Sequence, residues 1–188
     1  QKKYDHFKVG IAVPVQTMVQ SEVSGVMFTV DPITKDKDRL VIEAAYGLGD
    51  YVVQGVVTPD HYEVSKSKSE IVLKQVNRQE VKEIRSPTGV KKASVPEKLQ
   101  SEQKLPDAQI LELAEIGKKI QHHYLFPQDL EWAYANDVVY ITQSRPITTL
   151  GDDGKKSTAD SPSTSSLTLI LKGAPASPGL VSGPVRIV

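Results

Sequence analysis

The stretch DLEWAYANDVVYITQSRP, residues 129–146, decides the fold and the candidate site of this chain. Its first half carries two acidic residues two positions apart, Asp129 and Glu131. Its second half carries Gln143 and Arg145 with the same spacing. Side chains two positions apart in a strand point to the same face. With the Asn-Asp pair between the halves as a turn, the segment predicts a β-hairpin that presents all four side chains to one cleft.

Two carboxylates, an amide and a guanidinium in one cleft suit a magnesium-bound polyphosphate. The alternative is that Asp129 and Glu131 are charges on a solvated outer face, while Leu130 and Trp132 turn to the core. Ile141 interrupts the polar face of the second strand. The pattern alone leaves both interpretations open.

The composition is that of an ordinary globular protein, with 39% hydrophobic and 24% charged residues. The 23 basic residues balance the 23 acidic ones, so the charge gives no footprint for nucleic acid or an anionic membrane. No stretch reaches the roughly 20 apolar residues of a membrane span. The chain has no cysteine, which excludes disulfides and thiolate metal sites and is compatible with a reducing compartment. We therefore expect a cytoplasmic protein that binds neither nucleic acid nor membrane.

Most of the chain has the pattern of β-strands. Expected strands cover residues 8–20, 25–32 and 40–48, followed by a hairpin over 61–76 and a polar, exposed excursion over 76–95. Residues 50–57 are ambiguous between a strand and a short helix. One long helix is predicted after Pro106, because apolar residues recur with a 3.6-residue period up to Tyr124. Antiparallel strands with one long packing helix indicate an α+β lobe.

The C-terminal part of the chain predicts a change of organisation. Residues 151–166 are rich in Gly, Ser, Thr and Asp, and we expect a flexible linker there. Residues 167–188 have the pattern of a new β-structure that stops within a strand, and the first residue is Gln rather than Met. We therefore expect an excerpt of a longer polypeptide, with a lobe over residues 1–150, the linker and a short β stub.

Two weaker candidates accompany the hairpin. Gly47 and Gly49 follow an expected strand, where they form either a tight turn or a loop that a phosphate can approach. The third glycine of a dinucleotide fingerprint and the Gly-Lys-Ser/Thr of a Walker loop are missing. Glu43, just before them, faces either the cleft or the solvent. His122 and His123 are neighbours on the expected helix and point apart, so we expect a structural role for both.

Four segments then occur in a distinctive order: SGVMFTVDP (24–32), VIEAAYGLGDYVVQGVVTPD (41–60), PQDLEWAYANDVVYITQSRPIT (127–148) and GAPASPGLVSGPVRIV (173–188). Together they resemble the phosphoenolpyruvate synthase (pyruvate, water dikinase) family, a relative of pyruvate phosphate dikinase. The resemblance implies that residues 1–150 are the C-terminal portion of an ATP-grasp nucleotide-binding domain. It implies that residues 167–188 begin a swivelling phosphohistidine domain. The N-terminal ATP-grasp lobe and the downstream phosphohistidine and pyruvate-binding domains would then lie elsewhere in the same polypeptide.

The resemblance also implies roles for single residues. Glu131 and Gln143 match the family's magnesium- and phosphate-binding pair, and Asp129 matches an accompanying acid. Arg145 matches the arginine that contacts the transferring phosphoryl group and is the candidate catalytic residue. The segment PVQTMV resembles the strand beside the adenine. The full set of expected cofactor-binding residues is Gln16, Met18, Glu43, Asp129, Glu131, Gln143 and Arg145.

The implied reaction uses Mg²⁺ and ATP to phosphorylate a histidine on the swivelling domain and then pyruvate, giving phosphoenolpyruvate, AMP and phosphate. We expect the longer polypeptide to act as a homodimeric transferase and the present chain alone to be inactive. A related phosphotransferase with another acceptor, such as rifampin phosphotransferase, is the first alternative. A non-catalytic nucleotide-binding or docking module is the second.

Overall fold

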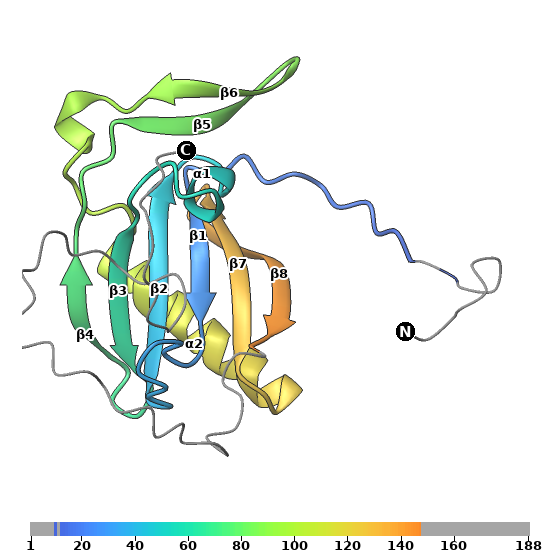
Figure 1. Cartoon of the computed structure of the whole chain (residues 1–188), viewed down its shortest axis with the longest axis vertical. Coiled ribbons are helices and arrows are strands. Elements are labelled where there is room, and N and C mark those ends of the chain that lie inside the picture. The colour runs from blue at the N-terminus through green and yellow to red at the C-terminus, as the bar shows by residue number, and fades with distance from the viewer. Residues whose placement is uncertain (1–9, 11, 148–188) are drawn as a thin grey trace, which may run out of the picture.

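The computed structural model describes residue 10 and residues 12–147 (Figure 1). The strands are β1 (Val23–Phe28), β2 (Arg39–Tyr46), β3 (Asp60–Ser65), β4 (Glu70–Gln75), β5 (Val81–Ser86), β6 (Gly89–Ser94), β7 (Gln128–Ala135) and β8 (Val138–Pro146). The helices are α1 (Asp50–Val53), α2 (Asp107–Tyr124) and a 3₁₀ turn (Glu97–Leu99). Six strands form an antiparallel sheet in the order β4-β3-β2-β1-β7-β8, and β5 pairs with β6 alone. The fold is α+β, as predicted.

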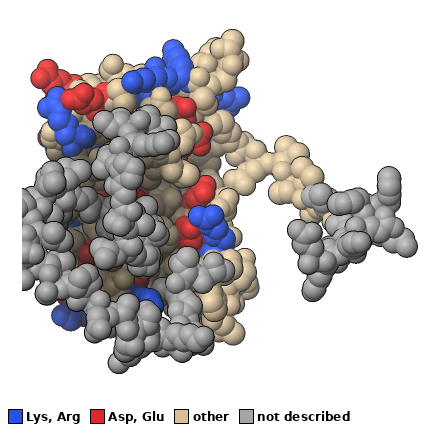
Figure 2. All heavy atoms as spheres, viewed as in Figure 1, with Lys and Arg blue, Asp and Glu red and all other residues tan. Residues whose placement is uncertain are grey.

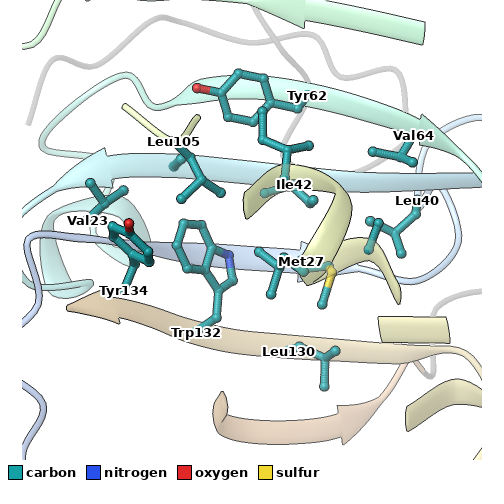
Figure 3. Packing of buried hydrophobic residues seen from close by; sticks show 14 residues of the cluster. Val23, Met27, Leu40, Ile42, Tyr62, Val64, Leu105, Leu130, Trp132 and Tyr134 are labelled. Carbon is teal, nitrogen blue, oxygen red and sulfur yellow. The ribbon is translucent and has the colours of Figure 1, made fainter. Parts of the chain in front are cut away.

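One face of the six-stranded sheet carries the core, against which α2 packs. Leu130, Trp132 and Tyr134 project from β7 to the same side as Met27 of β1 and Ile42 of β2 (Figure 3). The buried residues of α2 are Ile110, Leu113, Ala114 and Gly117. Since successive strand residues alternate between faces, the residues between these apolar ones lie on the opposite face of the sheet. The packing of the core therefore decides which face carries the polar side chains of β7.

A glycine at the centre of the sheet permits this packing. β1 lies between β2 and β7, and Gly25 pairs with Ala44 on one side and Trp132 on the other. A Cβ added at Gly25 would lie 1.8 Å from the carbonyl oxygen of Glu43 and 3.1 Å from the indole ring of Trp132. No larger residue fits without moving a neighbouring strand. Gly25 therefore allows the Trp132 indole to pack against β1.

Most of the expected elements are confirmed, although their ends differ. The structure contains the strands expected over 25–32 and 40–48, the hairpin over 61–76 and the helix after Pro106. The ambiguous segment 50–57 forms the short helix α1. His122 and His123 lie in the last turn of α2, and no helix in the described part of the chain is long and apolar enough to cross a membrane. The expected linker and β stub lie outside the described residues.

The strand expected over residues 8–20 is wrong where the structure describes it. Residues 12–20 have no regular secondary structure, and the side chains of Val13 and Val15 are 78% and 98% exposed. β1 already has β2 and β7 on its two edges, and within the described ranges no strand pairs with 12–20. A Val-rich segment becomes a strand only where a partner satisfies its backbone groups.

The expected polar excursion forms the β5–β6 hairpin, which lies across the end of the six-stranded sheet, above α1 (Figure 1). Its basic residues are Lys82, Arg85, Lys91 and Lys92. Basic side chains accordingly gather along the top edge of the molecule in Figure 2. The hairpin touches the main sheet near its end at β2.

Candidate functional site

The turn between β7 and β8 has the conformation that a two-residue hairpin needs. Asn136 and Asp137 have φ angles of 51° and 60°. These left-handed values match the twist of antiparallel strands, and Asn and Asp tolerate them better than most residues. The hydroxyl of Tyr134 donates a hydrogen bond of 2.8 Å to the Asp137 carboxylate, which holds the turn against β7. The predicted Asn-Asp turn is confirmed.

A β-bulge decides which way the side chains of β8 point. The register shifts after Glu131, so that Glu131 pairs with Gln143 whereas Trp132 pairs with Ile141, leaving Thr142 as the extra residue. Ile141 packs against the core. Gln143 lies on the opposite face, across from Glu131. The bulge thus removes the interruption that simple alternation predicted at Ile141, so that Gln143 and Arg145 share the face of Glu131 and Asp129.

Asp129 and Arg145 form an ion pair one step further along this face. The Nε and Nη2 atoms of Arg145 lie 2.8 Å and 2.7 Å from Oδ2 of Asp129. The Asp129 side chain is 12% exposed and that of Arg145 is 64% exposed. A guanidinium has five N–H groups in a fixed plane, so a carboxylate that holds one edge leaves further donors for an anion. The arginine expected at the phosphoryl group is therefore oriented by the acid expected beside it.

A cleft of about 360 Å³ opens beside Glu131. Three of the expected cofactor-binding residues line it: Gln16 and Met18 from the N-terminal segment, and Glu131 from β7. The other four do not line it but lie on the same face of the sheet as Glu131, namely Glu43, Asp129, Gln143 and Arg145. The structure thus places the seven residues in one region, with the cleft at one end and the ion pair at the other.

Glu43 and Glu131 belong to one cross-strand row. Val26 of β1 pairs with Glu131 on one side and with Glu43 on the other, and Glu43 pairs in turn with His61 of β3. Burial raises the pKa of the Glu43 carboxyl, and the nearby His61 opposes this shift. His61 Nε2 also lies 3.6 Å from the Glu63 carboxylate. The face is therefore rich in carboxylates, as expected for a surface that receives cations.

The donors on this face fit Mg²⁺ only if other ligands complete its shell. Glu131 and Gln143 offer a carboxylate and an amide oxygen from paired positions. Residues 10 and 12–147 contain no group of three or more His, Cys, Asp or Glu that could hold a metal ion. Mg²⁺ normally keeps several waters and takes other oxygens from bound phosphates, so two protein donors suffice for that mode of binding.

The two glycines of the Gly-x-Gly segment have different positions. Gly47 has a φ of 90°, and a Cβ there would lie 2.3 Å from the carbonyl oxygen of Glu83. The tight-turn interpretation therefore fits Gly47. Gly49 and Asp50, at the start of α1, line the cleft.

Sequence reasoning missed several residues that line the cleft. Leu48, Val53 and Val90 also line it, from the loop after β2, from α1 and from β6. Val53 follows the Gly-x-Gly segment closely enough for the strand-to-loop pattern to have suggested it. Val90 belongs to the excursion, and no signal in the sequence connects it to the cleft.

Comparison with known proteins adds the family. Residues 1–165 match the family described as pyruvate phosphate dikinase, AMP/ATP-binding domain. The whole chain is 46% identical to a probable phosphoenolpyruvate synthase of Methanocaldococcus jannaschii, of which it covers 16%. It is 44% identical over 98% of its length to the phosphoenolpyruvate synthase of Pyrococcus furiosus, covering 24% of that protein. It is 42% identical over 80% of its length to the rifampicin phosphotransferase of Bacillus cereus, covering 17%. The chain thus spans about a quarter or less of the length of these relatives.

Proposed function

The chain belongs to the pyruvate phosphate dikinase AMP/ATP-binding domain family, and we propose that it forms one side of the ATP site of a dikinase. In the proposed reaction, ATP phosphorylates a histidine on a separate swivelling domain. The phosphohistidine then passes its phosphoryl group to pyruvate while a water molecule accepts the other phosphate lost from ATP, so the products are phosphoenolpyruvate, AMP and phosphate. Residues 1–150 are the C-terminal portion of the nucleotide-binding domain, 151–166 the linker and 167–188 the start of the phosphohistidine domain.

One observation carries this proposal: Glu131 both lines the cleft and pairs with Gln143 on the polar face. A nucleotide in the cleft would therefore reach the oxygen donors with its phosphates. Glu131 and Gln143 would hold Mg²⁺, which neutralises phosphate charge. The match of residues 1–165 to an AMP/ATP-binding family supports the same placement.

The Asp129–Arg145 pair has a separate role in the proposal. Arg145 places positive charge beside the transferring phosphoryl group, where negative charge accumulates in the transition state. The Asp129 carboxylate contacts Nε and Nη2 of Arg145 and so orients the guanidinium before the nucleotide binds. The arginine then needs no reorientation during the reaction, which is the physical basis of electrostatic preorganisation.

Transfer to an acceptor other than pyruvate is a second candidate, favoured by the 42% identity to a rifampicin phosphotransferase. The side chains in the described cleft do not distinguish the two, because both would use the same nucleotide. An assay of the protein at its natural length separates them. AMP release that depends on pyruvate supports the first candidate, and AMP release that depends on rifampicin supports the second.

Alanine substitution of the two central residues tests the proposed site. In the protein at its natural length, Glu131→Ala or Arg145→Ala should slow ATP-dependent phosphorylation of the histidine domain about 100- to 1000-fold. Transfer of radiolabel from ATP measures the rate, and thermal unfolding checks the fold. Glu70→Ala on the edge strand β4 is the matched control and should keep the wild-type rate. Near-normal rates in both site variants would rule out the assignment.

The present chain provides a second test. Because the other phosphate ligands would lie in the rest of the polypeptide, the 188-residue chain alone should not turn over ATP. Measurable ATP hydrolysis by the purified chain, abolished by Glu131→Ala, would contradict this expectation.

A further inference from the structure

Part of the cleft lining is apolar, although most of these side chains are exposed. Met18, Val53 and Val90 are 46%, 66% and 51% exposed, and all three line the cleft together with the buried Leu48. The four residues come from three separate parts of the chain: the segment before β1, the stretch from the end of β2 through α1, and β6. Single exposed apolar residues are ordinary, but several that converge on one concavity indicate a surface for an apolar ligand group. Glu131 lines the same cleft and gives it a polar part.

Val90 is the unexpected member of this group. It is the second residue of β6, directly after the hairpin turn, and pairs with Arg85 of β5. The hairpin stands outside the six-stranded sheet and lies across its end beside α1 (Figure 1). Val90 can therefore contact a ligand only if the hairpin is held in a defined position.

A buried glutamine holds the first strand of the hairpin. Gln79 is 1% exposed, and its Oε1 accepts a 2.8 Å hydrogen bond from the Tyr46 N–H. Its Nε2 donates to the carbonyl oxygens of Tyr46 and Val81 at 3.0 Å and 2.9 Å. The backbone N–H of Leu48 donates a 2.9 Å hydrogen bond to the carbonyl oxygen of Glu83. The end of β2, the loop that lines the cleft and the start of β5 therefore form one connected unit.

A buried ion pair holds the chain on both sides of the hairpin. Lys104 Nζ lies 3.1 Å from Oδ1 of Asp60, and both side chains are completely buried. The same carboxylate accepts hydrogen bonds from the N–H groups of Asn77 and Lys104, each at 2.9 Å, and from the Tyr62 hydroxyl at 2.7 Å. The residues that precede β5 and follow β6 are thus tied to β3. The position of the hairpin is fixed from both directions.

We propose that the β5–β6 hairpin closes the base side of the nucleotide site, with Val90 contacting the purine ring and Gln79 positioning the hairpin. The inference rests on the proposed function, in which the phosphates lie toward Glu131 and Gln143. The apolar side chains of Met18, Val53 and Val90 then contact the flat aromatic faces of the base. A volume of about 360 Å³ is within the usual range for small-molecule sites.

The basic residues of the hairpin provide a rival explanation. Arg85 pairs directly with Val90 and therefore projects from the same face of the hairpin. If the hairpin acted on the phosphates by charge, Arg85 would matter and Val90 would not. A ligand that keeps the phosphates and lacks the base separates the two explanations, and inorganic tripolyphosphate is such a ligand.

Calorimetric titration of the protein at its natural length, with ATP and with inorganic tripolyphosphate in the presence of Mg²⁺, tests the inference. Val90→Ala should weaken ATP binding about three- to tenfold, because it removes apolar surface that the base covers. It should leave tripolyphosphate binding unchanged. Val72→Ala is the matched control, since Val72 is a partly exposed valine of β4 that does not line the cleft. Glu131→Ala should weaken the binding of both ligands.

The outcomes separate this inference from the proposed function. Unchanged ATP affinity in Val90→Ala, with both ligands weakened in Glu131→Ala, overturns the role of Val90 alone. If Arg85→Ala weakens the binding of both ligands and Val90→Ala has no effect, the hairpin acts on the phosphates. That outcome also overturns the role of Val90. A wild-type protein that binds neither ATP nor tripolyphosphate removes the proposed function together with this inference.

Discussion

The β7–β8 and β5–β6 hairpins have the same simple form, yet different forces hold them in place. In β7, Leu130 and Trp132 are almost completely buried in the main core. The β5–β6 hairpin contributes little to that core and is held by buried polar groups, chiefly Gln79 and Lys104. Apolar burial is non-directional and follows the alternation of the strand, whereas hydrogen bonds require particular partners at particular distances. The position of a hairpin held by apolar burial can therefore be predicted from a local sequence pattern. The position of a hairpin held by buried hydrogen bonds cannot.

The difference extends to what each hairpin offers a ligand. The core fixes β7–β8 so that its other face presents charged groups, among them Glu131 and the Asp129–Arg145 pair. The polar contacts of β5–β6 fix a hairpin whose contribution to the cleft is the apolar Val90. The β7–β8 hairpin is thus held by apolar burial and presents charged groups to the ligand. The β5–β6 hairpin is held by polar contacts and presents an apolar side chain.

The largest effect is expected from a substitution that removes the apolar support of β7–β8. Trp132→Ala should lower the free energy of unfolding by about 3–5 kcal/mol, because the indole is buried beside Met27 and leaves a cavity. Denaturation with urea measures the loss. Tyr140→Ala, on the exposed part of β8, should cost less than about 1 kcal/mol. Equal losses in the two variants would show that the core does not hold this hairpin.

An intermediate effect is expected for the polar support of β5–β6. Gln79→Ala removes three hydrogen bonds and leaves the backbone N–H and C=O of the half-buried Tyr46 without this partner, at a cost of about 1–3 kcal/mol. Amide hydrogen exchange should accelerate at Tyr46 and Leu48 but remain unchanged at Trp132. Gln75→Ala on the exposed face of β4 serves as the control. Uniform acceleration across both hairpins would contradict their separate anchoring.

The smallest expected effect concerns charge on the polar face beside β7–β8. Burial raises the pKa of Glu43 above its ordinary value of 4.5, so the folded protein binds this proton more tightly than the unfolded chain does. Stability is therefore lost as the pH rises from about 4.5 through the pKa of the folded protein. Glu43→Gln should raise the free energy of unfolding at pH 7 by less than about 1 kcal/mol and change it little near pH 4.

Urea denaturation at the two pH values measures this difference, with Glu70→Gln as the exposed control. A stabilisation by Glu43→Gln that is equal at both pH values would point to a cause other than ionisation.

Local patterns predicted much of the fold because the same residues create both the pattern and the core. The period of α2 and the alternation of β7 directly reflect the side chains that become buried, and the Asn-Asp turn needs only its own two residues. The pattern failed at Val13 and Val15, because a strand requires a partner that local sequence does not reveal. It was incomplete at Ile141, because the extra residue in β8 inverts the alternation of side chains between the two faces of the sheet.

By itself, the sequence determined the α+β class, the long helix, the β7–β8 hairpin and the presence of an acid pair opposite Gln143 and Arg145. These follow from contacts between near neighbours in the chain. The tertiary structure decided that β1 separates Glu131 from Glu43, that the bulge brings Gln143 onto the polar face, and that Val90 reaches the cleft. The first and the last depend on pairing or buried hydrogen bonds between segments far apart in sequence, and the bulge depends on the register that β8 takes once Ile141 packs against the core. This geometry exists only once the chain has folded.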